Sequence, residues 1–565
     1  MSIILVDQQK KEYDPVLSGA DEWPVVKLAR SRKEFIDEVI KSTVETIKSQ
    51  RPTPGQLKEE IELTMFREIL RVKENPWKID PDDEMLFWQK IRKRMAGLSV
   101  SDKEELTEAM GDILQKIVTR YVNEIAGNFK KSRYRLTRTI VTFGFSRLLN
   151  AARFRGIKGL FKGRLTLQDK IHIRGYPETV RKLARIGTII MVPTHFSNLD
   201  SVTIGWVINT LGLPPFIYGA GLNLFNISIF AYFMNSLGAY KVDRRKKNMI
   251  YLETLKTYSS LALRKGCHSL FFPGGTRSRS GMIEKKLKLG LLGTAIETQR
   301  MNIVNSNGSE PQKIFVVPVV INYTFVLEAV QLIRDYLAQK GQERYYLESD
   351  RYSNSFKIFS YLIRFFLHGS NISVTMGKAM DLFGNYVDEE GRSLDRNGNV
   401  IDIRDYFLLH GAITVDKQRE SEYTKKLADK IISEFHSNSR VFASHLCAFI
   451  AFEMLRKKHS RLDLYNFLRL PTEELVVRYQ EFRENFGKLR QVIFDMEKKR
   501  LIQSSDHLMI DDIDELIRFG IHNVGIFHTR RPLIIDREGN ITTKDLNTLY
   551  YYRNRLDGYG LEKYI

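Results

Sequence analysis

Short apolar runs that alternate with helical stretches are the feature that most constrains the fold of this chain. The runs cover residues 188–192, 269–272, 314–321 and 372–376. Runs of this length are typical of buried strands, and strands that alternate with helices usually form a sheet with helices on its faces. The sequence therefore predicts an α/β domain with a central sheet flanked by helices.

The regions on either side of these runs have a different pattern. Residues 30–153 are heavily charged, and apolar residues recur there at helical spacing, for example in 113–125. From residue 421 onward the pattern is again mainly helical, and we expect helices over 423–435, 441–458 and 472–499. We therefore expect three regions: an N-terminal helical region (1–153), an α/β domain (154–435) and a mainly helical C-terminal region (436–565).

The chain is strongly basic, with 88 Lys and Arg against 67 Asp and Glu and a formal charge of +21. Such an excess attracts polyanions, which include nucleic acid, anionic lipid headgroups and phosphorylated substrates. The basic residues are spread along the chain and form no recognisable nucleic-acid-binding motif, so no nucleic-acid partner is expected.

The two cysteines and the N-terminus bear on the compartment. Cys267 and Cys447 form no disulfide framework and no metal-ligand pattern, so we expect both to be buried and the compartment to be reducing. The N-terminus has only a brief apolar run before charges begin, and no signal peptide is expected.

Residues 201–240 contain no Asp, Glu, Lys, Arg or His, in a chain of which 27% is charged. The segment is either the buried layer of the α/β domain or an acyl-chain groove or membrane-dipping face. Pro214, Pro215 and several asparagines interrupt it, and a spanning helix needs about 20 continuous apolar residues. A transmembrane helix is therefore the least favoured interpretation.

A histidine and an aspartate follow the first apolar run, in the motif T-H-F-S-N-L-D. On one helix, His195 and Asp200 would lie about 140° apart, so they meet only if a turn intervenes. Pro193, Ser197 and Asn198 favour such a turn, with Asp200 in the first turn of the next helix. An aspartate that holds one imidazole nitrogen leaves the other free to take a proton from a hydroxyl. The alternative is a packed loop histidine without a catalytic role.

The same H-x4-D spacing occurs a second time, at His507 and Asp512. This copy follows no apolar run and lies among acidic residues. We expect it to be a solvated surface segment.

A glycine-rich turn with two arginines follows the second apolar run, in F-P-G-G-T-R-S-R-S-G. Gly274 and Gly275 allow the backbone to approach an anion, and Arg277 and Arg279 can form forked bonds to phosphate oxygens. The alternative is a strand-to-helix connection with surface arginines. A Walker lysine and Rossmann spacing are both missing, which disfavours nucleotide binding.

Two further blocks complete an ordered set. The block G-A-Y-K-V-D-R-R at 238–245 contains Arg244, and the strand-like run V-V-P-V-V-I-N-Y covers 316–323. In this order, over residues 187–323, the four blocks resemble those of the glycerolipid acyltransferase family: H-x4-D, G-x-x-F-[IV]-D-R, F-P-E-G-T-R-S and V-P-[IV]. Residues 117–125 and 549–555 look like segments of the large bacterial glycerol-3-phosphate 1-O-acyltransferases.

The resemblance implies an activity and a set of site residues. The activity is transfer of a fatty acyl group from acyl-CoA or acyl-carrier protein to the primary hydroxyl of glycerol 3-phosphate, giving lysophosphatidate for phospholipid synthesis. It implies no metal and no cofactor, and a peripheral location on the anionic cytoplasmic face of the cell membrane. The implied site residues are the general base His195, its partner Asp200, and, for binding glycerol phosphate, Arg244, Gly275, Arg277 and Ser278.

The chain departs from the family pattern at two positions. Gly274 stands where the third block has glutamate, and Phe196 stands where the closest relatives often have arginine. The first change removes a carboxylate that would contact the acceptor, and the second reshapes the pocket. A non-catalytic or altered-acceptor homologue that binds lipid or an acyl carrier is therefore the alternative.

Overall fold

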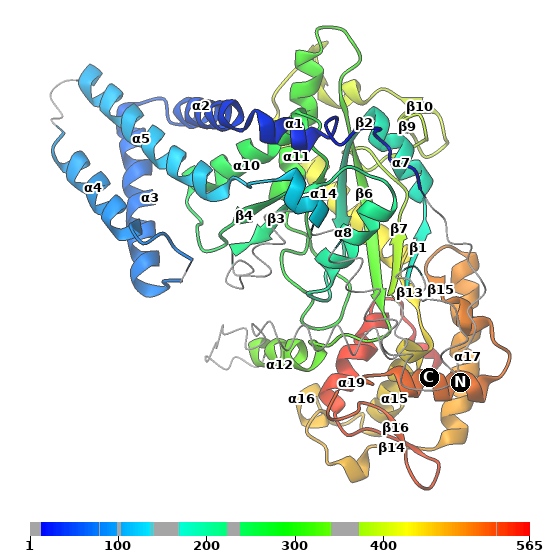
Figure 1. The fold of residues 1–565 in the computed structure, drawn as a ribbon. Coiled ribbons are helices and arrows are strands. Elements are labelled where there is room, and N and C mark those ends of the chain that lie inside the picture. Colours follow the sequence, from blue (N-terminus) through cyan, green and yellow to red (C-terminus); the bar gives the residue numbers. More distant parts are fainter. Residues whose placement is uncertain are drawn as a thin grey trace.

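The computed structural model describes residues 13–77, 79–98, 103–136, 139, 168, 170–222, 238–340, 372–526 and 528–565. A seven-stranded sheet lies at its centre, in the order β1-β7-β6-β2-β5-β3-β4 (Figure 1). The strands are β1 (Ile171–Gly175), β2 (Gly187–Pro193), β3 (Ile217–Gly221), β4 (Ala239–Val242), β5 (Ser269–Leu270), β6 (Lys313–Tyr323) and β7 (Ile372–Met376). The predicted α/β fold with a central sheet flanked by helices is confirmed.

The sheet is mostly parallel. Among the pairs of neighbouring strands that the structure describes in this sheet, only β6 and β7 are antiparallel. The carboxyl ends of β2, β3, β4, β5 and β6 therefore meet at one edge, where the loops of an α/β sheet usually form the site.

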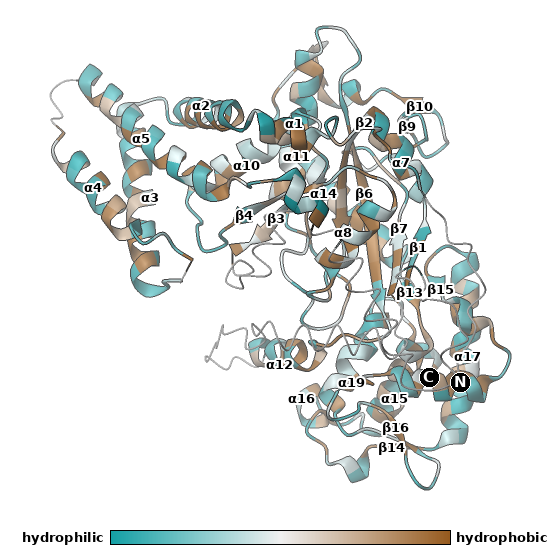
Figure 2. Cartoon of the chain, viewed as in Figure 1, coloured by the Kyte–Doolittle hydropathy of each residue, from teal (hydrophilic) through white to brown (hydrophobic). Residues whose placement is uncertain are grey.

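The central strands explain why the sequence showed continuous apolar runs. Every residue of β6 after Lys313 and every residue of β2 after Gly187 is buried. Parallel strands covered on both faces lack the apolar–polar alternation of exposed sheets. In Figure 2 these strands form the hydrophobic centre of the molecule.

Helices cover this sheet. They are α7 (Pro177–Ile186), α8 (Asp200–Thr210), α10 (Met249–Arg264), α11 (Gly290–Asn305) and α14 (Lys417–Ser437). One of these, α8, contains the start of the charge-free segment and buries Ile204, Trp206 and Val207. Together with β3, it supports the buried-layer interpretation for residues 201–222, whereas residues 223–237 lie outside the described residues.

The predicted strand at 269–272 is too long. The strand β5 ends at Leu270, although the Phe271 N–H still donates to the Met191 carbonyl (3.2 Å). The chain then turns, because Pro273 has no N–H for a sheet and Gly275 begins a left-handed conformation. Phe272 is thereby released from the sheet and turned towards the neighbouring loop.

The N-terminal region is helical, as predicted. Its helices are α1 (Pro24–Arg30), α2 (Arg32–Gln50), α3 (Pro54–Glu74), α4 (Glu84–Ala96) and α5 (Lys103–Ile125). They share a hydrophobic cluster with α10 and with residues of β3 and β4, so that they attach at one side of the sheet and extend away from it (Figure 1). Among the described helices, none is both long and apolar enough to cross a membrane.

The C-terminal region lies beside the opposite part of the sheet and shares its hydrophobic core. Between β7 and α14 the chain forms five short strands, which are β8 (Tyr386–Val387), β9 (Ser393–Leu394), β10 (Val400–Ile401), β11 (Leu408–Leu409) and β12 (Ala412–Ile413). The remaining elements are α12 (Ala329–Lys340), η5 (Ile403–Phe407), β13 (Arg440–Val441), α15 (Ala443–Lys458), α16 (Leu464–Phe467), η6 (Thr472–Glu474), β14 (Val476–Val477), α17 (Tyr479–Lys498), β15 (Gln503–Ser504), η7 (Asp506–Met509), α18 (Ile513–Asn523), β16 (Ile534–Ile535), β17 (Ile541–Thr542), α19 (Leu546–Arg553), η8 (Asn554–Leu556) and η9 (Glu562–Tyr564). The three predicted regions stay a prediction, because the core is continuous across residue 436.

Two sequence-based predictions fail in the C-terminal region. The helix predicted over 472–499 begins only at Tyr479, because Val476 and Val477 pair with β17. His507, predicted to be solvated, is 6% exposed: its ring stacks on Phe442, and its Nε2 accepts the Ala443 N–H (3.3 Å). Burial lowers the pKa of His507 to about 4.

Candidate active site

The structure brings His195 and Asp200 together at the carboxyl end of β2. His195 lies on the loop after β2, and Asp200 is the first residue of α8. The distance from His195 Nδ1 to Asp200 Oδ2 is 2.7 Å. The turn expected from the sequence between the two residues is present, while their catalytic roles stay a prediction.

Asp200 is completely buried and its oxygens meet only donors in the described part of the chain. Oδ2 accepts the Phe196 N–H (2.7 Å) and the Ser197 N–H (2.9 Å), and Oδ1 accepts the Tyr323 hydroxyl (2.5 Å). Because a carboxylate oxygen surrounded in this way acts as an acceptor, the hydrogen between it and the imidazole lies on His195 Nδ1. His195 Nε2 is then the nitrogen with a free lone pair for a proton.

The His195 ring is held on its face as well as at its edge. The ring of Phe272 stacks on it, with 4.1 Å between centroids and 23° between planes. The His195 side chain keeps 18% of its surface exposed, so it lies at an opening and not in solid packing. The ring is therefore fixed in orientation and still open to a ligand.

The glycine-arginine loop lies against the histidine loop. The Ser278 N–H donates to the His195 carbonyl (2.7 Å), and the Gly275 N–H closes a turn onto the Phe272 carbonyl (3.0 Å). Gly275 has a φ of +80°, a conformation that glycine adopts without strain. The two motifs found separately in the sequence thus form one site.

Glu328 links these two loops from the segment after β6. Its Oε1 accepts the Asn198 N–H (2.9 Å) and lies 3.5 Å from Arg277 Nη1, and its Oε2 accepts the Ser197 hydroxyl (3.1 Å). Arg277 is thereby held on the same side of the site as His195, with 19% of its side chain exposed. A guanidinium placed in this way can bind an anionic substrate group.

Arg244 is not brought into this cluster. It lies in the turn after β4 with its side chain exposed, and it makes no hydrogen bond or ion pair with any of the described residues. Its role in binding the acceptor stays a prediction. Its neighbour Arg245 has a structural role, since it pairs with Asp80 and Asp243 and lies over the Trp77 ring at 4.0 Å.

The C-terminal segment also reaches the site. Asn554 Nδ2 donates to the Ser280 carbonyl (2.9 Å), and the guanidinium of Arg555 lies 3.5 Å from the centroid of the Phe196 ring. Arg555 is 4% exposed, and its Nη1 has no hydrogen-bond partner in the described part of the chain. Phe196 is therefore the platform for an arginine from a distant part of the chain.

Sequence reasoning named none of the supporting residues as functional. Tyr323 ends the fourth block, and Arg555 ends the terminal segment on which the resemblance partly rested, so both lay inside quoted motifs without an assigned role. Phe272 opens the second motif. Glu328 carried no signal beyond being an acidic residue near apolar ones.

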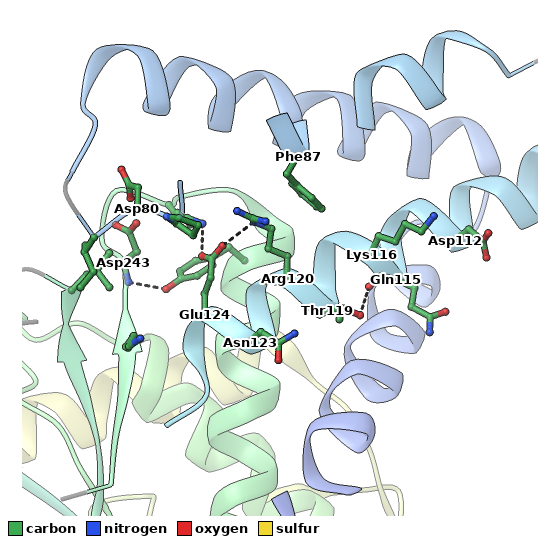
Figure 3. A pocket seen from close by; sticks show the side chains of 16 residues that line it. Asp80, Phe87, Asp112, Gln115, Lys116, Thr119, Arg120, Asn123, Glu124 and Asp243 are labelled. Atoms are coloured by element: carbon green, nitrogen blue, oxygen red, sulfur yellow. Dashed lines mark hydrogen bonds and ion pairs between the residues drawn. The ribbon is translucent and has the colours of Figure 1, made fainter. Parts of the chain in front are cut away.

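A pocket of about 800 Å³ lies elsewhere, between the N-terminal helices and β4 (Figure 3). Three of its charged groups pair with one another: Arg120 Nε lies 3.4 Å from Glu124 Oε1, and Lys246 Nζ lies 2.5 Å from Glu124 Oε2. His195 does not line this pocket. These ion pairs hold the N-terminal helix α5 against the turn after β4.

Residues 175–322 match the family model described as Acyltransferase. The match extends from the end of β1 almost to the end of β6, so it contains both loops of the site. The chain therefore carries an acyltransferase domain, and acyl transfer in lipid synthesis is the class of reaction that this domain supports.

Proposed function

We propose that the protein is an O-acyltransferase that moves a fatty acyl group from acyl-CoA or acyl-carrier protein to the primary hydroxyl of glycerol 3-phosphate. The observation that carries the proposal is the 2.7 Å contact between His195 and Asp200, beside the loop of Arg277 and inside the acyltransferase domain. The product is lysophosphatidate, a precursor of phospholipids.

The reaction is a direct transfer in one active site. His195 Nε2 takes the proton of the acceptor hydroxyl while the hydroxyl oxygen attacks the thioester carbonyl carbon. The tetrahedral intermediate collapses, the C–S bond breaks, and the leaving thiolate receives the proton from the imidazolium. Positioned general-base catalysis of this kind contributes about 10²–10⁴-fold to the rate.

Asp200 supports this role by holding the imidazole and by stabilising the positive charge that the ring acquires. Its own position is fixed by three donors besides His195. Such preorganisation keeps the base aligned without reorganisation during the reaction.

The acceptor's phosphate is bound, in this proposal, by Arg277 with Gly275 and Ser278, and by Arg244, which the family resemblance assigns to the same role. Forked, charge-assisted bonds favour a phosphate over an uncharged alcohol. Net charge of +21 favours a peripheral position on the anionic cytoplasmic face of the membrane, where each nearby Lys or Arg contributes about 1 kcal/mol.

Gly274 favours one alternative, which is a homologue that binds lipid or an acyl carrier but has another acceptor or no turnover. The glycine removes the side chain at the position where the family's third block has an acid. This alternative predicts binding without lysophosphatidate formation.

An acceptor panel tests the proposal against the alternative. Purified protein is given acyl-CoA or acyl-carrier protein with glycerol 3-phosphate, glycerol or 1-acylglycerol 3-phosphate. We expect one released thiol for each ester formed with glycerol 3-phosphate, and kcat/KM at least about 10-fold lower for glycerol, which lacks the phosphate. Transfer to 1-acylglycerol 3-phosphate alone, or vesicle binding without any transfer, would contradict the proposal.

A further inference from the structure

The backbone does not require glycine at Gly274. Its φ lies outside the left-handed region, in contrast to the φ of +80° at Gly275. The neighbouring side chain does require it: a Cβ at position 274 would lie 2.8 Å from Glu284 Cγ and 3.0 Å from Glu284 Oε1. A side chain at position 274 therefore fits only if the side chain of Glu284 moves from its present position.

Glu284 lies in the loop that follows the glycine-arginine motif, and it contacts the loop of His195. Its Oε1 accepts the His195 N–H at 3.2 Å. Its Oε2 is buried and has no hydrogen-bond partner in the described part of the chain. A buried acceptor without a donor is costly, which indicates that Glu284 is kept for a role other than packing.

Burial dominates the electrostatics of Glu284. Burial raises the pKa of Glu284 to about 7, while the positive charge of Arg555 acts in the opposite direction. Arg555 also lies over Phe196, the residue next to His195. Glu284 and Arg555 therefore both contact the loop of His195 and Phe196, although they come from two distant parts of the chain.

We propose that Glu284 is a positioning residue for His195, and that its carboxyl group fills the place beside the loop that a side chain at position 274 would otherwise take. This inference rests on the proposed function, because it assigns His195 as the base. By this arrangement, the carboxyl group beside Gly274 comes from a residue ten positions further along the chain.

A double-mutant cycle tests the proposal through kcat/KM for glycerol 3-phosphate and through the melting temperature. Glu284→Gln keeps an acceptor for the His195 N–H, and we expect kcat/KM within about threefold of wild type; Glu284→Ala removes it and lowers kcat/KM about 10-fold or more. Gly274→Glu alone forces two side chains into one space, so both the activity and the melting temperature fall. The double variant Gly274→Glu/Glu284→Ala relocates the acceptor and should exceed, about 10-fold or more, the activity expected if the two single effects multiplied.

A matched control separates positioning from filling of space. Gly274→Met/Glu284→Ala restores the volume without an acceptor, so it should recover the melting temperature but not the activity. Multiplicative activities in the Gly274→Glu cycle, or equal activities of the Glu and Met double variants, would overturn the proposal. If the wild-type protein transfers no acyl group, the proposed function fails by itself. Additive changes in melting temperature in the same cycle would show that the side chains at positions 274 and 284 do not compete for one space.

Discussion

At the scale of single residues, the site depends on Asp200 and its donors. The chain nearby supplies two of them, the N–H groups of Phe196 and Ser197, because the turn folds back on the first residue of α8. The third donor is Tyr323, 123 residues further along the chain. Tyr323, at the end of β6, thereby holds the Asp200 carboxylate, which in turn holds the imidazole of His195.

Tyr323→Phe tests this arrangement. The ring is 2% exposed and keeps its packing in the variant, but Asp200 Oδ1 loses the hydroxyl that donates to it. A buried acceptor left unpaired costs about 1–3 kcal/mol, so we expect lower thermal stability and a kcat about 10-fold lower. Steady-state kinetics and thermal melting measure both, with the exposed Tyr564→Phe as the control. A kcat equal to that of the control would show that Tyr323 does not hold Asp200 in the active geometry.

Sequence patterns were sufficient to place His195 beside Asp200, because the spacing, the proline and the cap-type residues define a local turn. They were not sufficient to find Tyr323, Glu328 or Glu284. These contacts join residues 89–131 positions apart, and nothing local in the sequence distinguishes such residues from ordinary core or surface positions.

At the scale of elements, the strands could be predicted better than their ends. β2, β6 and β7 were evident as apolar runs, because strands buried on both faces need no polar alternation. β5 was predicted too long, and α17 was predicted to start too early, since pairing between distant strands overrides local propensity.

The C-terminal helix α19 and the short helix η8 are part of the site although they lie outside the segment that matches the acyltransferase family model. They bring Asn554 to the glycine-arginine loop and Arg555 to the histidine loop. The segment 546–556 therefore contacts both the loop of His195 and the loop of Arg277, which the spacing of residues within the motifs does not indicate.

At the scale of the whole molecule, three histidines are buried among the described residues and remain neutral: one beside β5 and two in the C-terminal region. Burial lowers the pKa of His268 to about 4, that of His445 to about 3 and that of His507 to about 4. His268 Nδ1 accepts the Ile189 N–H (3.0 Å), a bond that protonation would remove. Each histidine has a higher proton affinity in the unfolded chain, so its contribution to stability is present above about pH 6.5 and is lost as the pH falls towards 4.

Acidification from pH 7.5 to 5 should therefore lower the free energy of unfolding by about 2 kcal/mol for each such histidine. His268→Asn keeps an acceptor for the Ile189 N–H but cannot titrate in this range. We expect urea unfolding of this variant to lose about 2 kcal/mol less than wild type over the same interval. The same loss in both proteins would contradict a neutral His268 in the core.

The central claim is that His195 is the base for acyl transfer, and one comparison of rates tests it most directly. His195→Ala is assayed with acyl-CoA and glycerol 3-phosphate beside His410→Asn, a change at an exposed histidine in the turn between β11 and β12. We expect a kcat for His195→Ala lower by about 10²-fold or more, with His410→Asn at the wild-type rate. A His195→Ala enzyme that forms lysophosphatidate at the wild-type rate would contradict it.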